Sequence, residues 1–75
     1  MQRMPIEVRI SEPALLEELM SLLLRSGCVT HRVSGDSCVV VHVAAAHSEE
    51  ARRELDFFVR AWGLAYPHVS AAVTA

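Results

Sequence analysis

Apolar and charged residues alternate near the start of the chain, over Ile6-Glu7-Val8-Arg9-Ile10. In an extended backbone, successive side chains point to opposite faces, so the three aliphatic residues share one face and the two charged residues share the other. Pro5 is compatible with the first position of a strand. We therefore predict a half-buried β-strand over residues 6–10.

Helical spacing follows this alternation. Ser11, Glu12 and Pro13 favour the start of a helix, because serine caps first-turn amides, an acidic residue suits the positive helix end and proline is tolerated there. A leucine-rich stretch then ends at Gly27, a typical helix stop. We predict a helix over residues 14–26. Its apolar positions recur at helical spacing: Leu15, Leu16, Leu19, Leu22 and Leu23.

Two β-rich segments, 28–33 and 38–43, flank Ser34-Gly35-Asp36-Ser37 and predict a hairpin. A two-residue Gly-Asp loop would place Val33 opposite Cys38. A bulge near the loop would shift the register by one residue. We favour the shifted register, with the valines of the second strand facing the core, because they would bury more apolar surface than Cys38, Val40 and His42. The core-facing sets would then be Val29, His31 and Val33 on the first strand and Val39, Val41 and Val43 on the second.

A second amphipathic helix is predicted after Ser48, which suits an N-cap and is followed by acidic residues in the first turn. Gly63 ends this helix, and Tyr66-Pro67 marks a turn into a last alternating strand. The helix buries Ala51, Leu55, Phe58, Val59 and Trp62, and the strand buries Val69, Ala71 and Val73.

The predicted order of elements is strand-helix-strand-strand-helix-strand within a single domain over residues 1–75. Right-handed crossovers make the compact solution an α+β, ferredoxin-like βαββαβ sandwich. Its four-stranded antiparallel sheet would have the order 4-1-3-2 and carry both helices on one face. The predicted core is Ile6, Val8, Ile10, Leu15, Leu19, Leu22, Leu23, Val29, Val33, Val39, Val41, Leu55, Phe58, Val59, Trp62, Val69, Ala71 and Val73.

Composition argues against several function classes. The chain is 52% hydrophobic and 21% charged, which is too apolar for intrinsic disorder, and its net charge of -2 gives no basic excess for nucleic acid. We expect no signal peptide, no membrane segment and a cytoplasmic location. All seven basic residues are arginine, which indicates a GC-rich, bacterial genome. The uncovered sheet face would carry no aromatic residue for RNA stacking; its residues would be Glu7, Arg9, Thr30, Arg32, Val40, His42, Ser70 and Thr74.

The reactive side chains form no recognisable catalytic or metal motif. Cys28 and Cys38 are not in a CxxC pair, and the four histidines lack HxH or HxxxH spacing. We therefore predict no catalytic residue, no metal and no cofactor. Two alternatives remain open: a small cysteine-dependent enzyme using either thiol with a histidine and Asp36, and a zinc site built from Cys38 and His42 with a partner chain.

The segment Ser11-Glu12-Pro13-Ala14-Leu15-Leu16, with Gly27 before the next strand, resembles the first strand-helix junction of ACT-type regulatory domains. That family shows Asp-x-Pro-Gly-x-Leu there. Ser11 stands at the aspartate, Pro13 at the proline, Ala14 at the glycine and Leu16 at the leucine, so two of the four positions depart. The resemblance implies an amino-acid ligand near Ser11, Glu12, Pro13 and Ala14.

These observations together predict a small, non-enzymatic binding or regulatory module that senses a small ligand such as an amino acid. We expect a homodimer, because the apolar residues exceed what one small core needs. The alternative is a partner-binding subunit or scaffold without its own ligand. The residues assigned to the dimer or partner surface are Met20, Leu24, Val40, Leu64 and Tyr66.

Overall fold

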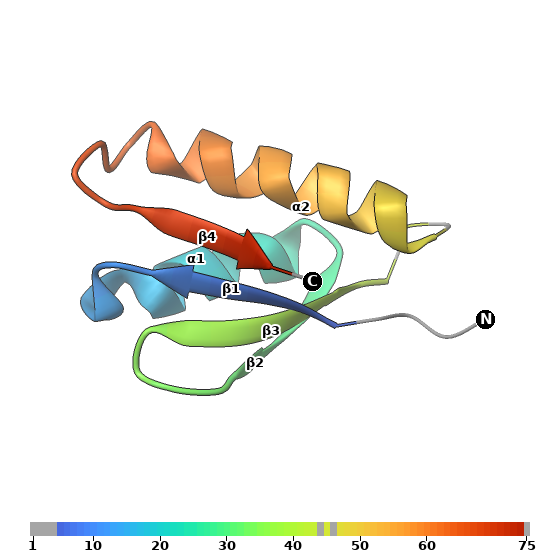
Figure 1. Ribbon diagram of the computed structural model, residues 1–75, viewed down its shortest axis with the longest axis horizontal. Helices are drawn as coiled ribbons and strands as arrows, with labels where there is room; N and C mark the ends of the chain where they lie inside the picture. The colour runs from blue at the N-terminus through green and yellow to red at the C-terminus, as the bar shows by residue number, and fades with distance from the viewer. Residues whose placement is uncertain (1–4, 44, 46, 75) are drawn as a thin grey trace.

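The computed structural model describes residues 5–43, 45 and 47–74, so residues 1–4, 44, 46 and 75 of the predicted domain lie outside it. The elements follow the order predicted from the sequence (Figure 1). They are β1 (Ile6–Ile10), a 3-10 turn η1 (Pro13–Leu15), α1 (Leu16–Arg25), β2 (Cys28–Arg32), β3 (Ser37–His42), α2 (Ser48–Gly63) and β4 (Ala71–Thr74).

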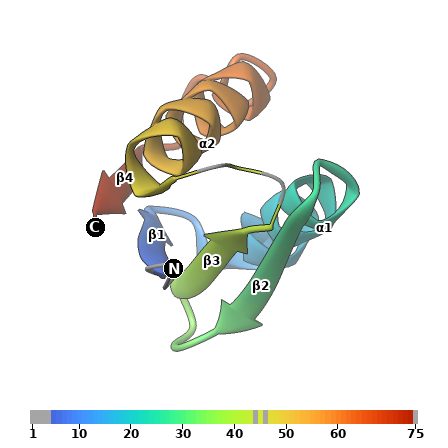
Figure 2. The ribbon, with the colours of Figure 1, turned by 90° about the vertical axis from the view of Figure 1, so that its right-hand side faces the viewer.

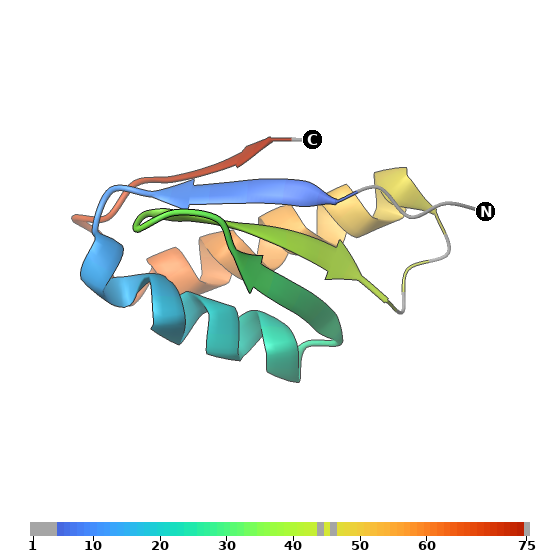
Figure 3. The ribbon, with the colours of Figure 1, turned by 90° about the horizontal axis from the view of Figure 1, so that it is seen from below.

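The strands form one antiparallel sheet of order β2-β3-β1-β4, so β1 and β3 are its central strands. Both helices lie on one side of the sheet and leave the other side uncovered (Figure 2). Three connections gather at one end of the sheet: the β1–α1 link, the β2–β3 turn and the α2–β4 loop (Figure 3). The protein is thus an α+β fold with an open four-stranded antiparallel sheet and two helices.

Pairing with β1 decides which side of β3 is buried. Ile6 is opposite Val40 and Val8 is opposite Cys38, and directly opposite residues in antiparallel strands project from the same face. The aliphatic side of β1 faces the helices, so Cys38 and Val40 face them too, and both are fully buried. His42 continues the same alternation and is 5% exposed.

The hairpin departs from a two-residue loop, as favoured from the sequence, but only two of the three expected pairs with valines form and the predicted face is wrong. Val29 is paired with Val41 and His31 with Val39, whereas Val33 donates its amide to the Ser37 carbonyl and is not opposite a valine. Val29 is nevertheless 55% exposed, and the valines of β3 at positions 39 and 41 are only half-buried. The reason is non-local, because β1 imposes its own alternation on β3 and turns these pairs to the uncovered side. The exposed residues wrongly assigned to the core are Val29, Val33 and Ala71.

The helix starts differ from the prediction at both caps. α1 begins at Leu16 after the 3-10 turn, and no side chain caps it. Ser11 is not its N-cap, since the Ser11 hydroxyl oxygen accepts a hydrogen bond from the Ser70 amide at 2.9 Å. The N-cap of α2 is His47, one residue before the predicted serine, and its Nδ1 accepts from the Glu50 amide at 3.2 Å. Gly27 has φ 89° after α1, a conformation that favours glycine.

The core lies between the sheet and the helix layer. Leu16, which the pattern left out of the core list, is fully buried. Leu15, Leu22, Phe58, Val69 and Val73 are half-buried around its edge. The buried hydrophobic residues are Ile6, Val8, Ile10, Leu16, Leu19, Leu23, Cys28, Cys38, Val40, Ala45, Ala51, Leu55, Val59 and Trp62.

The inverted hairpin face predicts losses of stability of different size for two valines on neighbouring strands. Val40→Ala should lower the free energy of unfolding by about 2 kcal/mol, because it removes buried methyl groups and leaves a cavity. Within one copy of the chain, Val29→Ala should cost less than about 1 kcal/mol, because only the strand preference of an exposed residue changes. Urea denaturation of both variants and the parent measures the difference. An equal or larger loss for Val29→Ala would contradict this orientation of the hairpin.

Candidate functional site

A surface hollow of about 320 Å³ lies where β1 ends, and we call it the β1-end hollow. Two backbone hydrogen bonds connect the segments that line it. The Ser11 amide donates to the Ser70 carbonyl at 2.9 Å, and the Ile10 amide donates to the Asp36 carbonyl at 2.9 Å. The end of β1 is therefore held between the start of β4 and the β2–β3 turn. The lining residues are Arg9, Ile10, Ser11, Asp36, Ser70, Ala71 and Ala72.

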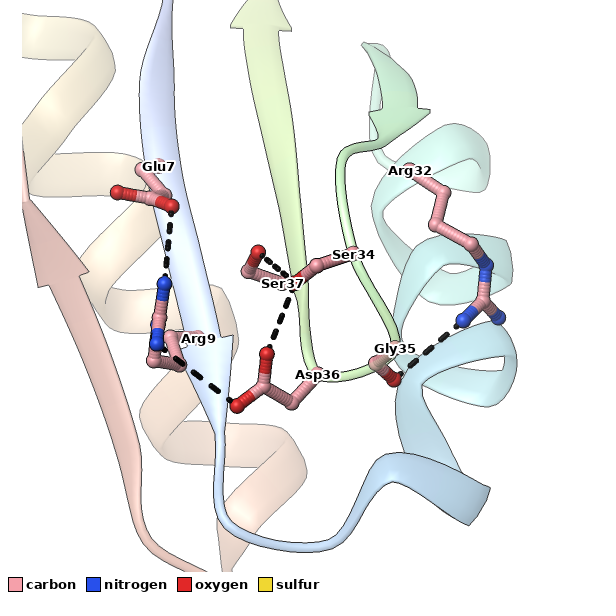
Figure 4. A network of polar contacts seen from close by, with 7 residues as sticks. All are labelled: Glu7, Arg9, Arg32, Ser34, Gly35, Asp36 and Ser37. Atoms are coloured by element: carbon pink, nitrogen blue, oxygen red, sulfur yellow. Dashed lines mark hydrogen bonds and ion pairs between the residues drawn. The ribbon is translucent and has the colours of Figure 1, made fainter.

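Two residues of opposite charge, Arg9 and Asp36, line this hollow, and their side chains lie close together (Figure 4). An Arg9 guanidinium nitrogen lies 3.9 Å from an Asp36 carboxylate oxygen, and another lies 3.7 Å from Glu7. Both distances exceed the roughly 2.7–2.9 Å of a direct charge-assisted hydrogen bond. The Arg9 side chain is 59% exposed, so its guanidinium keeps donors for an incoming anion.

The hairpin turn holds Asp36 more firmly. The Ser34 hydroxyl donates to the second Asp36 carboxylate oxygen at 2.9 Å, and its oxygen lies 2.6 Å from the hydroxyl oxygen of the buried Ser37 (Figure 4). Arg32 adds a contact of 3.4 Å to the Gly35 carbonyl across the same turn. Asp36 is thus an anion held by the turn, beside Arg9, an exposed cation.

Only one of the four predicted ligand residues lines the hollow. Ser11 does, with its hydroxyl already engaged by β4. Glu12, Pro13 and Ala14 are exposed in the link to α1 and are not among the lining residues. Sequence reasoning missed Arg9 and Asp36 as a pair, because nothing local indicates that the hairpin turn folds back against the end of β1.

A second hollow, the inter-helix groove, separates α1 from the end of α2 and measures about 340 Å³. The Tyr66 hydroxyl donates to the Glu18 carboxylate across it, and this bond raises the pKa of Tyr66 above its ordinary value. The Tyr66 and Trp62 ring centres are 4.8 Å apart. The lining residues are Glu18, Leu22, Arg25, Ala61, Trp62, Ala65 and Tyr66.

The residues predicted to form a dimer or partner surface do not share one patch. Val40 is fully buried, so its assignment to a surface is wrong. Met20 and Leu24 line a hollow along α1, and Tyr66 lines the inter-helix groove. Leu64 is 84% exposed just after α2.

The histidine and carboxylate that lie near Cys28 differ from the set expected from the sequence. Cys28 is opposite His42, whose Nε2 lies 2.6 Å from a Glu54 carboxylate oxygen, so the carboxylate associated with this pair is Glu54 rather than Asp36. Burial raises the pKa of Cys28 and of Cys38, and the Glu54 charge raises that of Cys28 further. A nucleophilic thiol needs exposure and a lowered pKa. The geometry therefore favours two structural thiols.

Metal ligands do not cluster in the part of the chain that the structure describes: no group of three His, Cys, Asp or Glu side chains there could hold an ion. Within the same residues, neither helix has the length and apolar character needed to cross a bilayer. Comparison with models of protein families, with curated protein sequences and with solved structures found no match to this chain.

Proposed function

We propose that this chain is a cytoplasmic, non-enzymatic regulatory module that binds a free amino acid in the β1-end hollow. The observation that carries this proposal is the pair of opposite charges, Arg9 and Asp36, that both line that hollow. Two charges of opposite sign at this spacing match a zwitterion, whereas either charge alone would favour a simple ion.

Each charge has a defined task in this proposal. The Arg9 guanidinium donates to the ligand carboxylate, because its planar array of N–H groups matches two carboxylate oxygens. The Asp36 carboxylate accepts from the ligand ammonium group, and its bond from Ser34 holds it in place. The ligand replaces a 3.9 Å ion pair with shorter contacts. The aliphatic and small residues of β1 and β4 in the lining leave room for a short side chain.

The arrangement of strands supports this proposal by analogy. Counted from β4, the sheet has the order β4-β1-β3-β2, which is the order expected of a ferredoxin-like sandwich. We propose that the chain is a ferredoxin-like domain of ACT type. The resemblance places an amino acid near the β1–α1 junction, and the hollow begins at Ser11 of that junction. Fold analogy does not establish function by itself, so the charge pair remains the main argument.

We propose a second copy of the chain as the occupant of the uncovered sheet face. Val29, Val39 and Val41 form an apolar patch there, which we call the valine face. Glu7 and Arg9 lie beside it, two residues apart on β1. A two-fold axis that sets β1 antiparallel to its copy would place each Glu7 near the other Arg9. The face is therefore self-complementary in charge as well as apolar.

Arg9 lines the β1-end hollow and also lies beside the valine face, so a ligand in the hollow could regulate dimer formation. An amino acid that takes up the Arg9 guanidinium removes it from the contact with the second copy, so the two binding events are coupled. Coupling of this kind lets a ligand alter an assembly without any catalytic step.

The amino-acid site predicts localised chemical-shift changes in the labelled protein. Single amino acids at millimolar concentration should shift the amides of residues 9–11, 36 and 70–72. Arg9→Gln should weaken binding at least about tenfold, because it removes a charged hydrogen-bond donor. Arg52→Gln, an exposed arginine on α2, is the matched control and should bind like the parent. Shifts that are absent, or that persist in Arg9→Gln, would contradict the site.

The homodimer predicts a sedimenting species of twice the 8.3 kDa chain mass at micromolar concentration. Val41→Glu should return it to the monomer, because a charge on the valine face cannot be buried without a partner. Leu64→Glu alters an exposed apolar residue outside that face and should leave the dimer intact. A parent chain that sediments as a monomer would overturn the dimer and favour a different partner protein on the same face.

A further inference from the structure

The strand β4 buries much less of its surface than the two central strands of the sheet. None of its four residues is buried, and Val73 alone is half-buried. β1, by contrast, buries three of its five residues, and β3 buries four of its six. A segment with little buried apolar surface opens at a lower free energy than the core does. β4 is therefore held to the sheet mainly by its backbone hydrogen bonds.

The other edge strand, β2, is anchored more firmly at its start. Cys28, its first residue, is 2% exposed, and only two residues separate it from α1. A longer segment, residues 64–70, joins α2 to β4. At the end of this segment, the Ser70 amide and carbonyl both bond to Ser11, which is itself exposed. β4 can thus leave the sheet without moving a helix or a buried side chain of its own.

The amides of β1 are divided between its two neighbouring strands. The Ser11 amide donates to the Ser70 carbonyl, on the β4 side. Successive residues of an antiparallel strand direct their backbone bonds to alternate sides. The Arg9 amide therefore also faces β4, whereas the Val8 amide faces β3. If β4 opened alone, the Arg9 amide would lose its protection and the Val8 amide would keep it.

The β1-end hollow lies across the boundary between β1 and β4. Arg9 and Asp36 line it from β1 and from the hairpin turn, and residues 70–72 line it from β4 and the residue before it. The hollow is therefore complete only while β4 is paired with β1. A ligand that contacts both sides binds the paired form better than the open form, and it shifts the equilibrium toward pairing.

We infer that β4 is a strap that opens while the rest of the sheet stays folded, and that an amino acid in the β1-end hollow closes it. The opening follows from burial and strand pairing, whereas the closing rests on the proposed function. In the open form, the side of β1 that pairs with β4 presents unpaired backbone groups, which are a template for another strand. The ligand thus controls whether this side of β1 is accessible.

Hydrogen exchange in the intact labelled protein, followed by NMR without ligand, tests the opening. After correction for intrinsic rates, the Arg9 amide should exchange at least about tenfold faster than the Val8 amide. Val73→Ala should increase this ratio, because it shortens the one half-buried side chain of β4. Leu64→Ala removes an exposed apolar side chain outside the sheet and should leave the ratio unchanged. Equal protection of the Arg9 and Val8 amides in the parent would overturn the strap.

The closing is tested with L-alanine as the probe, in the same exchange experiment. At ten times its dissociation constant, L-alanine should slow exchange of the Arg9 amide about tenfold, because binding depletes the open form by mass action. The Gly27 amide, bonded to the Leu24 carbonyl at the end of α1, reports local opening elsewhere and should keep its rate.

Two results would overturn the closing in distinguishable ways. Chemical-shift changes at residues 9–11 and 36 that show bound L-alanine, together with an unchanged exchange rate at Arg9, would refute the coupling and leave the amino-acid site intact. No shift change at these residues would refute the amino-acid site and the closing together. The ratio of the Arg9 and Val8 exchange rates without ligand would decide the opening in either case.

Discussion

The pairing of β1 with β3 is the constraint on which the rest of the structure depends. Val8 opposite Cys38 and Ile6 opposite Val40 place the aliphatic side of both central strands against the helices. Side chains alternate with a period of two, so a slip of one residue would turn Cys38 and Val40 to the uncovered side and put Val39 and Val41 against the helices. Burying a valine side chain is worth at least about 1.5 kcal/mol, a large part of the stability expected for a small domain.

Both candidate sites follow from this arrangement. β1 lies between β3 and β4, so its last residues can contact the hairpin turn on one side and the start of β4 on the other. This places Arg9 beside Asp36. Both helices cover one face of the sheet, and the groove that contains Trp62 is lined by α1 and by the end of α2. Both candidate surfaces thus lie where the packing of two elements is incomplete.

Local pattern was sufficient to predict the elements but not their faces. Alternation over residues 6–10 and helical spacing over α2 each have one apolar side, so both were placed correctly. β3 is apolar on both sides, because Val39 and Val41 compete with Cys38, Val40 and His42 for the core. No local property decides between them, and the deciding contact lies with β1, about thirty residues earlier in the chain.

Site residues were predictable only in part, for a related reason. Ser11 was identified from a motif and does line the β1-end hollow. Its role as a cap was wrong, because the amide of Ser70, distant in sequence, donates to its hydroxyl. The approach of Arg9 to Asp36, and that of Tyr66 to Glu18, are likewise contacts between distant segments. These residues are visible in the sequence, but no local pattern indicates that they lie close together in the fold.

Methyl NOE spectroscopy on valine- and leucine-labelled protein tests the central constraint most directly. We expect cross-peaks from the Val40 methyl groups to buried leucines of the helices, Leu19, Leu23 or Leu55, since all belong to one core. It also predicts a Val29–Val41 cross-peak and none from either of these valines to the buried leucines. Cross-peaks from Val41 to those leucines, with none from Val40, would contradict the register between β1 and β3.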